Sequence, residues 1–508
     1  MRSRHGFASL AAMLLAVMAG LCGSPSMAAD DAGQNIVHGW IRIRPHVSNF
    51  ASFNFGQVLP SDKKGDGKNA VNFVEQRSHL YITPKLGDYF EGRFAFEIDQ
   101  RWGDSAYGSG AQAGAGFNAD QINIETKNVQ IGFKVPESAY SGTFGLQTIK
   151  DPYNGLIMGW SDAAGITLNK TLSEASSVTL GYYRFWQPSA TFKKQKEVDF
   201  IRVEFASNSE GLSFGVNLHG IMDNTGADGA GALGGDPYGT ATGNGYAPFS
   251  FNVSTGNESL VGSTKYTMSL WMPGVNFNAK MGGLGLEGFF VYESGSFKSS
   301  TDGVSNVSIA SYAAQLGASM MMGETSLKLQ GFMVSGDDSN KANGIGIKPG
   351  GFYGPGVYSF AGAWMGLTGL KIAFSDLDAT NQDAALIYDP ANIMEQQPLG
   401  LTVVSLTANT PLSGNSHIEA AAGMVNSAKN RVVNGANQML TEVNAGYHYT
   451  PAPGFDIGLT LSYGIVGNFY KVTKDQADAY NKKAPGKDVS ALDPDNMWRL
   501  TLRTNLTF

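Results

Sequence analysis

The last twelve residues alternate between apolar and polar side chains. The apolar residues hold even positions, namely Trp498, Leu500, Leu502, Leu506 and Phe508, and the polar ones hold odd positions, namely Arg499, Thr501, Arg503, Asn505 and Thr507. Successive side chains of a β-strand point to opposite faces, so this segment is a strand with one apolar face. A soluble strand buries that face, whereas an outer-membrane barrel turns it toward lipid and places the arginines in a wet lumen.

The segment 89–102 shows the same two-residue period more strongly. Apolar side chains share one parity and charged side chains the other, namely Phe90, Phe94, Phe96, Ile98 and Trp102 against Glu91, Arg93, Glu97, Asp99 and Arg101. Charged groups are costly to bury in a dry core unless each is paired. The charged face of this strand is therefore expected to lie in water, inside a barrel.

Comparable segments recur along the whole chain and predict eighteen strands, with sixteen as the second possibility. The expected strands are roughly 35–55, 72–83, 89–102, 122–135, 142–150, 164–172, 176–186, 198–206, 211–222, 267–281, 284–297, 307–320, 324–335, 399–410, 415–426, 437–450, 455–470 and 496–508. Their connections alternate between long and short, which is typical of outer-membrane barrels. We expect an all-β fold, a transmembrane antiparallel up-and-down β-barrel with long extracellular loops and short periplasmic turns.

The segment 357–374 is also apolar and strand-like, but a further strand there breaks the even count. We place it inside the long loop 336–398, where it either folds into the lumen or covers a subunit boundary. Tryptophan prefers the membrane–water interface. Four tryptophans at the long-loop ends of expected strands therefore predict an interface girdle: Trp102, Trp186, Trp271 and Trp498.

The first residues predict export from the cytoplasm. Arg2 and Arg4 precede a short apolar stretch, and Ser26-Met27-Ala28 fits a cleavage site, so residues 1–28 read as a signal peptide. Residues 29–508 are then a single barrel domain. The one cysteine, Cys22, lies in the signal, which excludes disulfides and thiolate metal sites from the mature chain.

Composition and motifs argue against an enzyme and against a nucleic-acid partner. Loss of Arg2 and Arg4 changes the formal charge from −7 to −9, because segment 1–28 holds no acidic residue. The chain has no His-Glu-x-x-His sequence and no phosphate-binding loop motif. His38 and His46 share one strand face and read as polar lumen residues. The acidic runs 337–340 and 376–378 read as solvated loops rather than calcium sites. We expect no cofactor, no metal and no catalytic residue.

The strongest functional signal is the set of charged residues on the expected lumen face. The predicted pore-lining residues are Arg42, Arg44, Glu75, Arg77, Glu91, Arg93, Glu97, Asp99, Arg101, Arg202, Glu204, Arg499 and Arg503. Opposed basic and acidic side chains in a narrow pore set ion preference and orient dipolar solutes. The alternative is that these residues pair across strands and brace the wall.

Several motifs resemble those of a known family. Phe96 to Gly103, Asn123 to Asn128 and Phe133 to Pro136 resemble the N-terminal half of the outer-membrane homotrimeric porins of sulfate-reducing bacteria, and Asp495 to Arg499 resembles their last strand. The pattern is also similar to that of alginate-export-like barrels. The porin resemblance implies a homotrimer, and the likeness to barrel proteins implies that Phe508 is the C-terminal signal read by the barrel-assembly machinery.

These expectations combine into a porin in the outer membrane of a Gram-negative bacterium. Its partners are outer-membrane lipid and the small hydrophilic solutes or ions that diffuse through a water-filled channel. One alternative is a substrate-specific channel or exporter for an anionic solute or acidic polysaccharide. Another is a structural or adhesive barrel without transport.

Overall fold

The computed structural model describes residues 34–50, 71–103, 112–115, 124–159, 161–186, 197–226, 266–299, 306–337, 350–352, 367–374, 399–483 and 491–508. Their strands are β1 (Gln34–Ser48), β2 (Val71–Leu86), β3 (Phe90–Trp102), β4 (Gln112–Ala115), β5 (Ile124–Lys134), β6 (Tyr140–Ile149), β7 (Ser161–Ser173), β8 (Ser176–Trp186), β9 (Val198–Ser209), β10 (Leu212–Gly226), β11 (Tyr266–Met281), β12 (Leu284–Ser299), β13 (Val307–Met322), β14 (Thr325–Val334), β15 (Leu401–Ser413), β16 (Ser416–Asn426), β17 (Gln438–Ala452), β18 (Phe455–Val466) and β19 (Met497–Thr507). The named helix is α6 (Lys474–Lys483).

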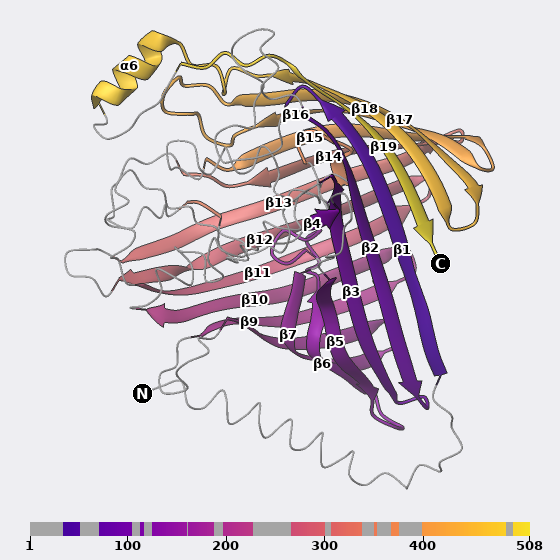
Figure 1. The fold of residues 1–508 in the computed structure, drawn as a ribbon. Helices are drawn as coiled ribbons and strands as arrows, with labels where there is room; N and C mark the ends of the chain where they lie inside the picture. The colour runs from indigo at the N-terminus through magenta and orange to yellow at the C-terminus, as the bar shows by residue number, and fades with distance from the viewer. Residues whose placement is uncertain are drawn as a thin grey trace.

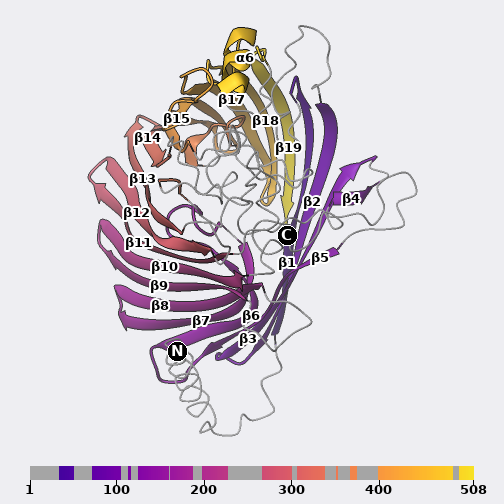
Figure 2. The same ribbon diagram turned by 90° about the vertical axis from the view of Figure 1, so that its left-hand side faces the viewer.

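Eighteen of these strands form a closed antiparallel barrel (Figures 1 and 2). Each strand pairs with the next along the chain, and β19 returns to β1 through pairs such as Trp40 with Thr507 and Ser48 with Arg499. The short strand β4 lies outside this ring and runs parallel to β3. The predicted all-β barrel of eighteen strands is confirmed, and sixteen strands is excluded.

Short and long connections lie at opposite ends of the barrel. Tight turns such as 282–283 and 453–454 join strands at one end, where Gly282 and Gly454 adopt left-handed backbone conformations with φ of 60° and 82°. Only glycine enters this region without strain. Helix α6 belongs to the connection between β18 and β19 and lies at the other end (Figure 1). Among the described residues, helices with the length and apolar character of a membrane span are absent.

Several element boundaries differ from the sequence prediction. Strand β1 stops at Ser48 instead of continuing to 55, because the side chain of Asn49 bonds the backbone of Trp498 and Asn496 and the chain bends there. Residues 51–55 lie outside the described part. Strand β18 stops at Val466, and α6 lies in a connection predicted to be a loop.

Strands β5 and β6 separate toward the long-connection end of the barrel, and we call this separation the fork. Their backbone pairing stops at Val129 with Leu146, although β5 continues along β3 and β6 along β7. Gly145 lies at the branch with φ of 116°, and a Cβ there would be 2.2 Å from the Val129 carbonyl oxygen. Above the branch, side chains bridge the strands, since Asn128 donates to Thr148 at 3.0 Å.

Candidate pore lining

Side-chain exposure separates the two faces of the barrel wall. In β3, Phe94 and Trp102 are 42% and 52% exposed, whereas Glu97 and Asp99 on the other parity are 3% and 4% exposed. In β19, Leu500 and Leu502 are exposed and Arg499 is buried. The outer face is apolar, as a lipid-facing surface must be, and the inner face carries the charges.

Most of the predicted charged residues lie on four adjacent strands. Cross-strand register places them on the same inner face, for instance Arg42 opposite Arg77, and Arg77 opposite Asp99. We call this surface the arginine wall; its arginines are Arg499 and Arg503 on β19, Arg42 and Arg44 on β1, Arg77 on β2, and Arg93 and Arg101 on β3. Four of the predicted acids share it: Glu75 on β2, and Glu91, Glu97 and Asp99 on β3.

The upper part of the arginine wall is held by ion pairs. Arg44 bonds Glu75, and both side chains are nearly inaccessible to solvent. His46 places Nε2 3.2 Å from the same carboxylate and Nδ1 3.0 Å from the Thr501 hydroxyl. These contacts link β1, β2 and β19 across the closing seam of the barrel.

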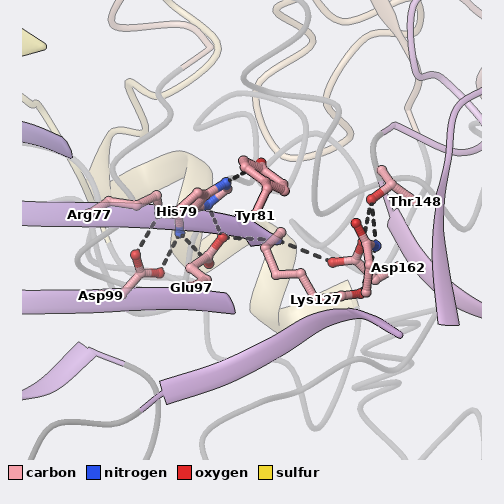
Figure 3. Close-up of polar contacts among 9 residues, drawn as sticks. Arg77, His79, Tyr81, Glu97, Asp99, Lys127, Thr148 and Asp162 are labelled. Atoms are coloured by element: carbon pink, nitrogen blue, oxygen red, sulfur yellow. Dashed lines mark hydrogen bonds and ion pairs between the residues drawn. The ribbon is translucent and has the colours of Figure 1, made fainter. Parts of the chain in front are cut away.

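A second charged network crosses β2, β3, β5 and β7 (Figure 3). Arg77 donates two hydrogen bonds to Asp99, at 2.7 and 2.6 Å, which is the bidentate geometry that makes such pairs strong. Lys127 lies 2.9 Å from Glu97 and 3.2 Å from Asp162. The sequence prediction missed Lys127 and Asp162, because the fork that brings them together is a tertiary feature.

Three arginines of the wall also lie against aromatic rings. The Arg93 guanidinium lies 4.6 Å from the centre of the Tyr81 ring, Arg101 lies 5.2 Å from Phe73, and Arg42 lies 5.2 Å from Trp40. A ring face orients a guanidinium without neutralising its charge. Among the described residues, Arg93 makes no ion pair with a carboxylate.

The remaining predicted pair lies across the barrel from this wall. Arg202 and Glu204 are on β9, and Glu204 accepts a hydrogen bond from His219 of β10 when Nε2 carries the proton, at 2.9 Å. Arg202 Nη1 lies 3.8 Å from Glu204 and donates to the Lys150 carbonyl oxygen. The predicted set of pore-lining residues therefore falls into two separate charged regions.

One inward segment follows β6. The carboxylate of Asp151 accepts backbone N–H groups from Tyr153, Gly155, Ile157 and Met158, so the segment folds around it. Burial raises the pKa of Asp151, and the backbone donors oppose that shift. The Tyr153 ring packs edge-on to His219 of the barrel wall.

A second inward segment, Leu367–Phe374, settles part of the open question about 357–374. Leu370, Ile372 and Phe374 are fully buried, and the Glu442 carboxylate of β17 accepts the backbone N–H groups of Ile372 and Ala373 at 2.8 Å each. These residues therefore fold into the lumen; 357–366 lie outside the described part.

Both inward segments join one apolar cluster with inner-face residues of the wall. The cluster includes Tyr153 and Ile157 from the first segment and Ile372 and Phe374 from the second. Among the described residues it contains none from β1, β2 or β3. The lumen thus has an apolar filling on one side and the arginine wall on the other.

The predicted girdle residues lie at the long-connection ends of their strands. Trp102, Trp271 and Trp498 point outward and are partly exposed, while for Trp186 only the backbone is described. Phe508 is 57% exposed at the opposite end, and its backbone N–H and C=O bond those of Gly39. The last residue thus helps to close the barrel.

Other candidate chemistry finds little support in the described residues. They hold no group of three or more His, Cys, Asp or Glu side chains arranged to bind a metal. Asp337 accepts the backbone N–H of Gly350, and the rest of both predicted acidic runs lies outside the described part. Ser213 falls in a Gly-x-Ser-x-Gly sequence, but it lies within β10 and not at the strand-to-helix turn of a nucleophile elbow.

Comparison with solved structures identifies the fold. OccK9 (OpdG) of Pseudomonas aeruginosa is 11% identical with a TM-score of 0.50, and the match covers 94% of this chain and 99% of that one. The fold is that of the outer-membrane porins. OccAB4 of Acinetobacter baumannii (9% identical, TM-score 0.47, covering 93% and 98%) and OpdK of Pseudomonas aeruginosa with vanillate (12%, 0.46, covering 93% and 99%) are also similar.

No protein-family model and no curated protein matches the chain. The comparisons support the fold of a porin-type barrel. They give no support to the narrower resemblance to porins of sulfate-reducing bacteria or to alginate exporters.

Proposed function

We propose that this chain forms a water-filled channel in the outer membrane of a Gram-negative bacterium, through which small hydrophilic solutes or ions diffuse, anions preferentially. The arginine wall is the observation that carries the proposal. Its seven arginines outnumber its four acids. A lumen wall with net positive charge favours anions, because the low-dielectric barrel strengthens its field.

The partners of these charges define their different roles. Arg44 and Arg77 form ion pairs with carboxylates and stabilise the wall. Arg93 is oriented by Tyr81 and keeps its charge available to a passing solute. Bracing of the wall and ion selectivity, the two roles that the sequence pattern left open, are thus proposed together for different residues of one wall.

The remaining parts of the proposal rest on sequence. Residues 1–28 direct export and are removed, Phe508 is read by the barrel-assembly machinery, and three copies associate. The tryptophans Trp102, Trp186, Trp271 and Trp498 mark the outer interface with lipid. The channel has no catalytic activity.

Planar-bilayer recording of the purified protein tests the proposal. We expect stepwise conductance in a KCl gradient with a reversal potential on the anion side. The double variant Arg93→Gln/Arg101→Gln should shift that potential toward cations. Lys170→Gln is the matched control, because Lys170 lies on the outer face over the Tyr140 ring. An unchanged potential in the double variant removes both arginines from the conduction path.

Two alternatives make different predictions in the same recordings. A specific channel for an anionic solute or acidic polysaccharide, which the arginine wall also favours, gives saturable conductance that its ligand blocks. A structural or adhesive barrel, which the apolar filling favours, gives no steps at any salt concentration.

A further inference from the structure

All six histidines beyond residue 28 lie on the inner face of the barrel. They are His38 and His46 on β1, His79 on β2, His219 on β10, His417 on β16 and His448 on β17. Histidine is the side chain whose ordinary pKa falls between pH 5 and 8. The histidines of this barrel face the lumen and not the outer surface.

Two of these histidines form a stacked pair near the short-turn end. His417 and His448 are directly opposite in the β16–β17 register, and their rings are 4.7 Å apart and inclined by 4°. Two imidazolium rings in this arrangement repel each other.

Acidic and basic groups lie next to the pair on most of the neighbouring strands. His448 Nε2 lies 3.3 Å from Glu419 of β16, and Nδ1 lies 3.9 Å from Asp456 of β18. Asp456 is already 3.0 Å from Arg503 of β19. In β15, the residues opposite His417 and Glu419 are uncharged, namely Pro411 and Asn409.

Two glycines make room for this arrangement. A Cβ at Gly458 would be 2.8 Å from the His448 ring, and a Cβ at Gly446 would be 2.8 Å from the Glu419 side chain. Both side chains therefore lie flat against bare backbone of the neighbouring strand. His448 and Glu419 are held in contact by the wall itself.

Glu419 also connects the pair to the second inward segment. Its Oε1 lies 3.2 Å from Lys371 Nζ, and the same oxygen is the one nearest His448. With His448 neutral, Lys371 faces a single negative charge. With His448 protonated, Lys371 faces that charge together with a new positive one, and the attraction is largely cancelled.

We propose that His448 is a proton-sensitive control on the inward segment Leu367–Phe374: protonation of His448 weakens the hold of Glu419 on Lys371 and loosens the segment. The hydrogen bonds that the backbone N–H groups of Ile372 and Ala373 donate to Glu442 remain, so the segment loosens without leaving the lumen. The consequence for conduction rests on the proposed channel function, but the control itself does not.

Hydrogen exchange measured by mass spectrometry on the full chain in detergent tests the control directly. In a peptide covering 371–373, protection corrected for intrinsic rates should fall about two- to fivefold from pH 8 to pH 5.5, the effect of losing one partly exposed ion pair. The fall should vanish in His448→Gln. It should persist in His38→Gln, an inner-face histidine that stacks on Tyr81 and makes no ion pair in the described residues.

A second variant, on the other side of the ion pair, tests the proposal independently of whether His448→Gln folds correctly. Lys371→Met should show the lower protection at both pH values. A fall that persists in His448→Gln assigns the response to another group such as Glu442 and overturns the proposal, as does an unchanged protection in the wild type.

Bilayer recordings separate this control from the channel function. Wild-type conductance should rise on acidification, and His448→Gln should remove the rise. A protein that never conducts, yet shows the exchange behaviour above, disproves the channel and keeps the control.

Discussion

Arginines on the same wall have different roles, and the partner of each arginine determines its role. Arg77 is 18% exposed and donates two short hydrogen bonds to Asp99, so the Asp99 carboxylate neutralises its charge within the wall. Arg93 stacks on Tyr81 and makes no carboxylate contact in the described residues. Removal of the first is therefore expected to affect stability, and removal of the second selectivity.

Arg77→Gln should destabilise the barrel by about 3 kcal/mol, because it leaves the buried Asp99 carboxylate without its partner. Guanidinium unfolding of the detergent-solubilised protein measures this loss. The double variant Arg77→Gln/Asp99→Asn should recover much of it, since no charge is then buried alone. An equal loss in both variants contradicts the pairing.

At the scale of elements, the fork between β5 and β6 is the point where the wall departs from a regular barrel. Strand β5 carries a bulge opposite Ala95 and Phe96, and β6 turns away at Gly145. Bulges bend a strand and re-aim its side chains. The two irregularities open the space that Lys127, Asn128 and Asp162 fill.

Gly145→Ala should cost about 3 kcal/mol or more, because the new Cβ would overlap the Val129 carbonyl oxygen and the backbone there is left-handed. The measurement is the fraction of heat-resistant, compact barrel on gels. Gly283→Ala in the β11–β12 turn is the control, since its Cβ would meet nothing within 4 Å. Equal folding of both variants would disprove the close approach at the fork.

The start of helix α6 is marked by a local sequence motif. Thr473 and Gln476 bond each other's backbone N–H groups, which is a capping box. Thr-x-x-Gln is visible in the sequence and marks the start of the helix that was predicted as loop. The ten residues that follow lack an apolar face of the usual kind, so periodicity did not reveal it.

At the scale of the whole molecule, closure depends on the two ends of the chain. Strand β19 pairs with β1, and Phe508 completes the seam through its two backbone bonds to Gly39. A barrel has no open edge only when this last pairing is complete. The C-terminus is therefore part of the wall.

Deletion of Phe508 should lower the yield of folded barrel in vivo at least about threefold, because its two backbone hydrogen bonds to Gly39 are lost. Phe508→Tyr keeps the backbone bonds and the aromatic ring and should fold as the wild type does. Heat-resistant barrel in outer-membrane fractions is the measure. Full assembly without Phe508 would contradict its role.

The alternating pattern by itself determined the strands and their two faces, and it favoured eighteen strands over sixteen. Side-chain parity is a local property of a strand, so Phe94 and Arg93 are assigned to opposite faces without any knowledge of their neighbours. The turn residues likewise fixed which connections are short. A barrel of eighteen strands follows, because each strand pairs with the next.

Only the tertiary structure decided which charges pair and what fills the lumen. Arg77 and Arg93 look alike in sequence, and it is cross-strand register that gives one a carboxylate and the other a ring. Glu442 meets Ile372 and Ala373 across about seventy residues of chain. Such contacts depend on closure of the whole barrel, because no local period encodes a distance between strands that are remote in sequence.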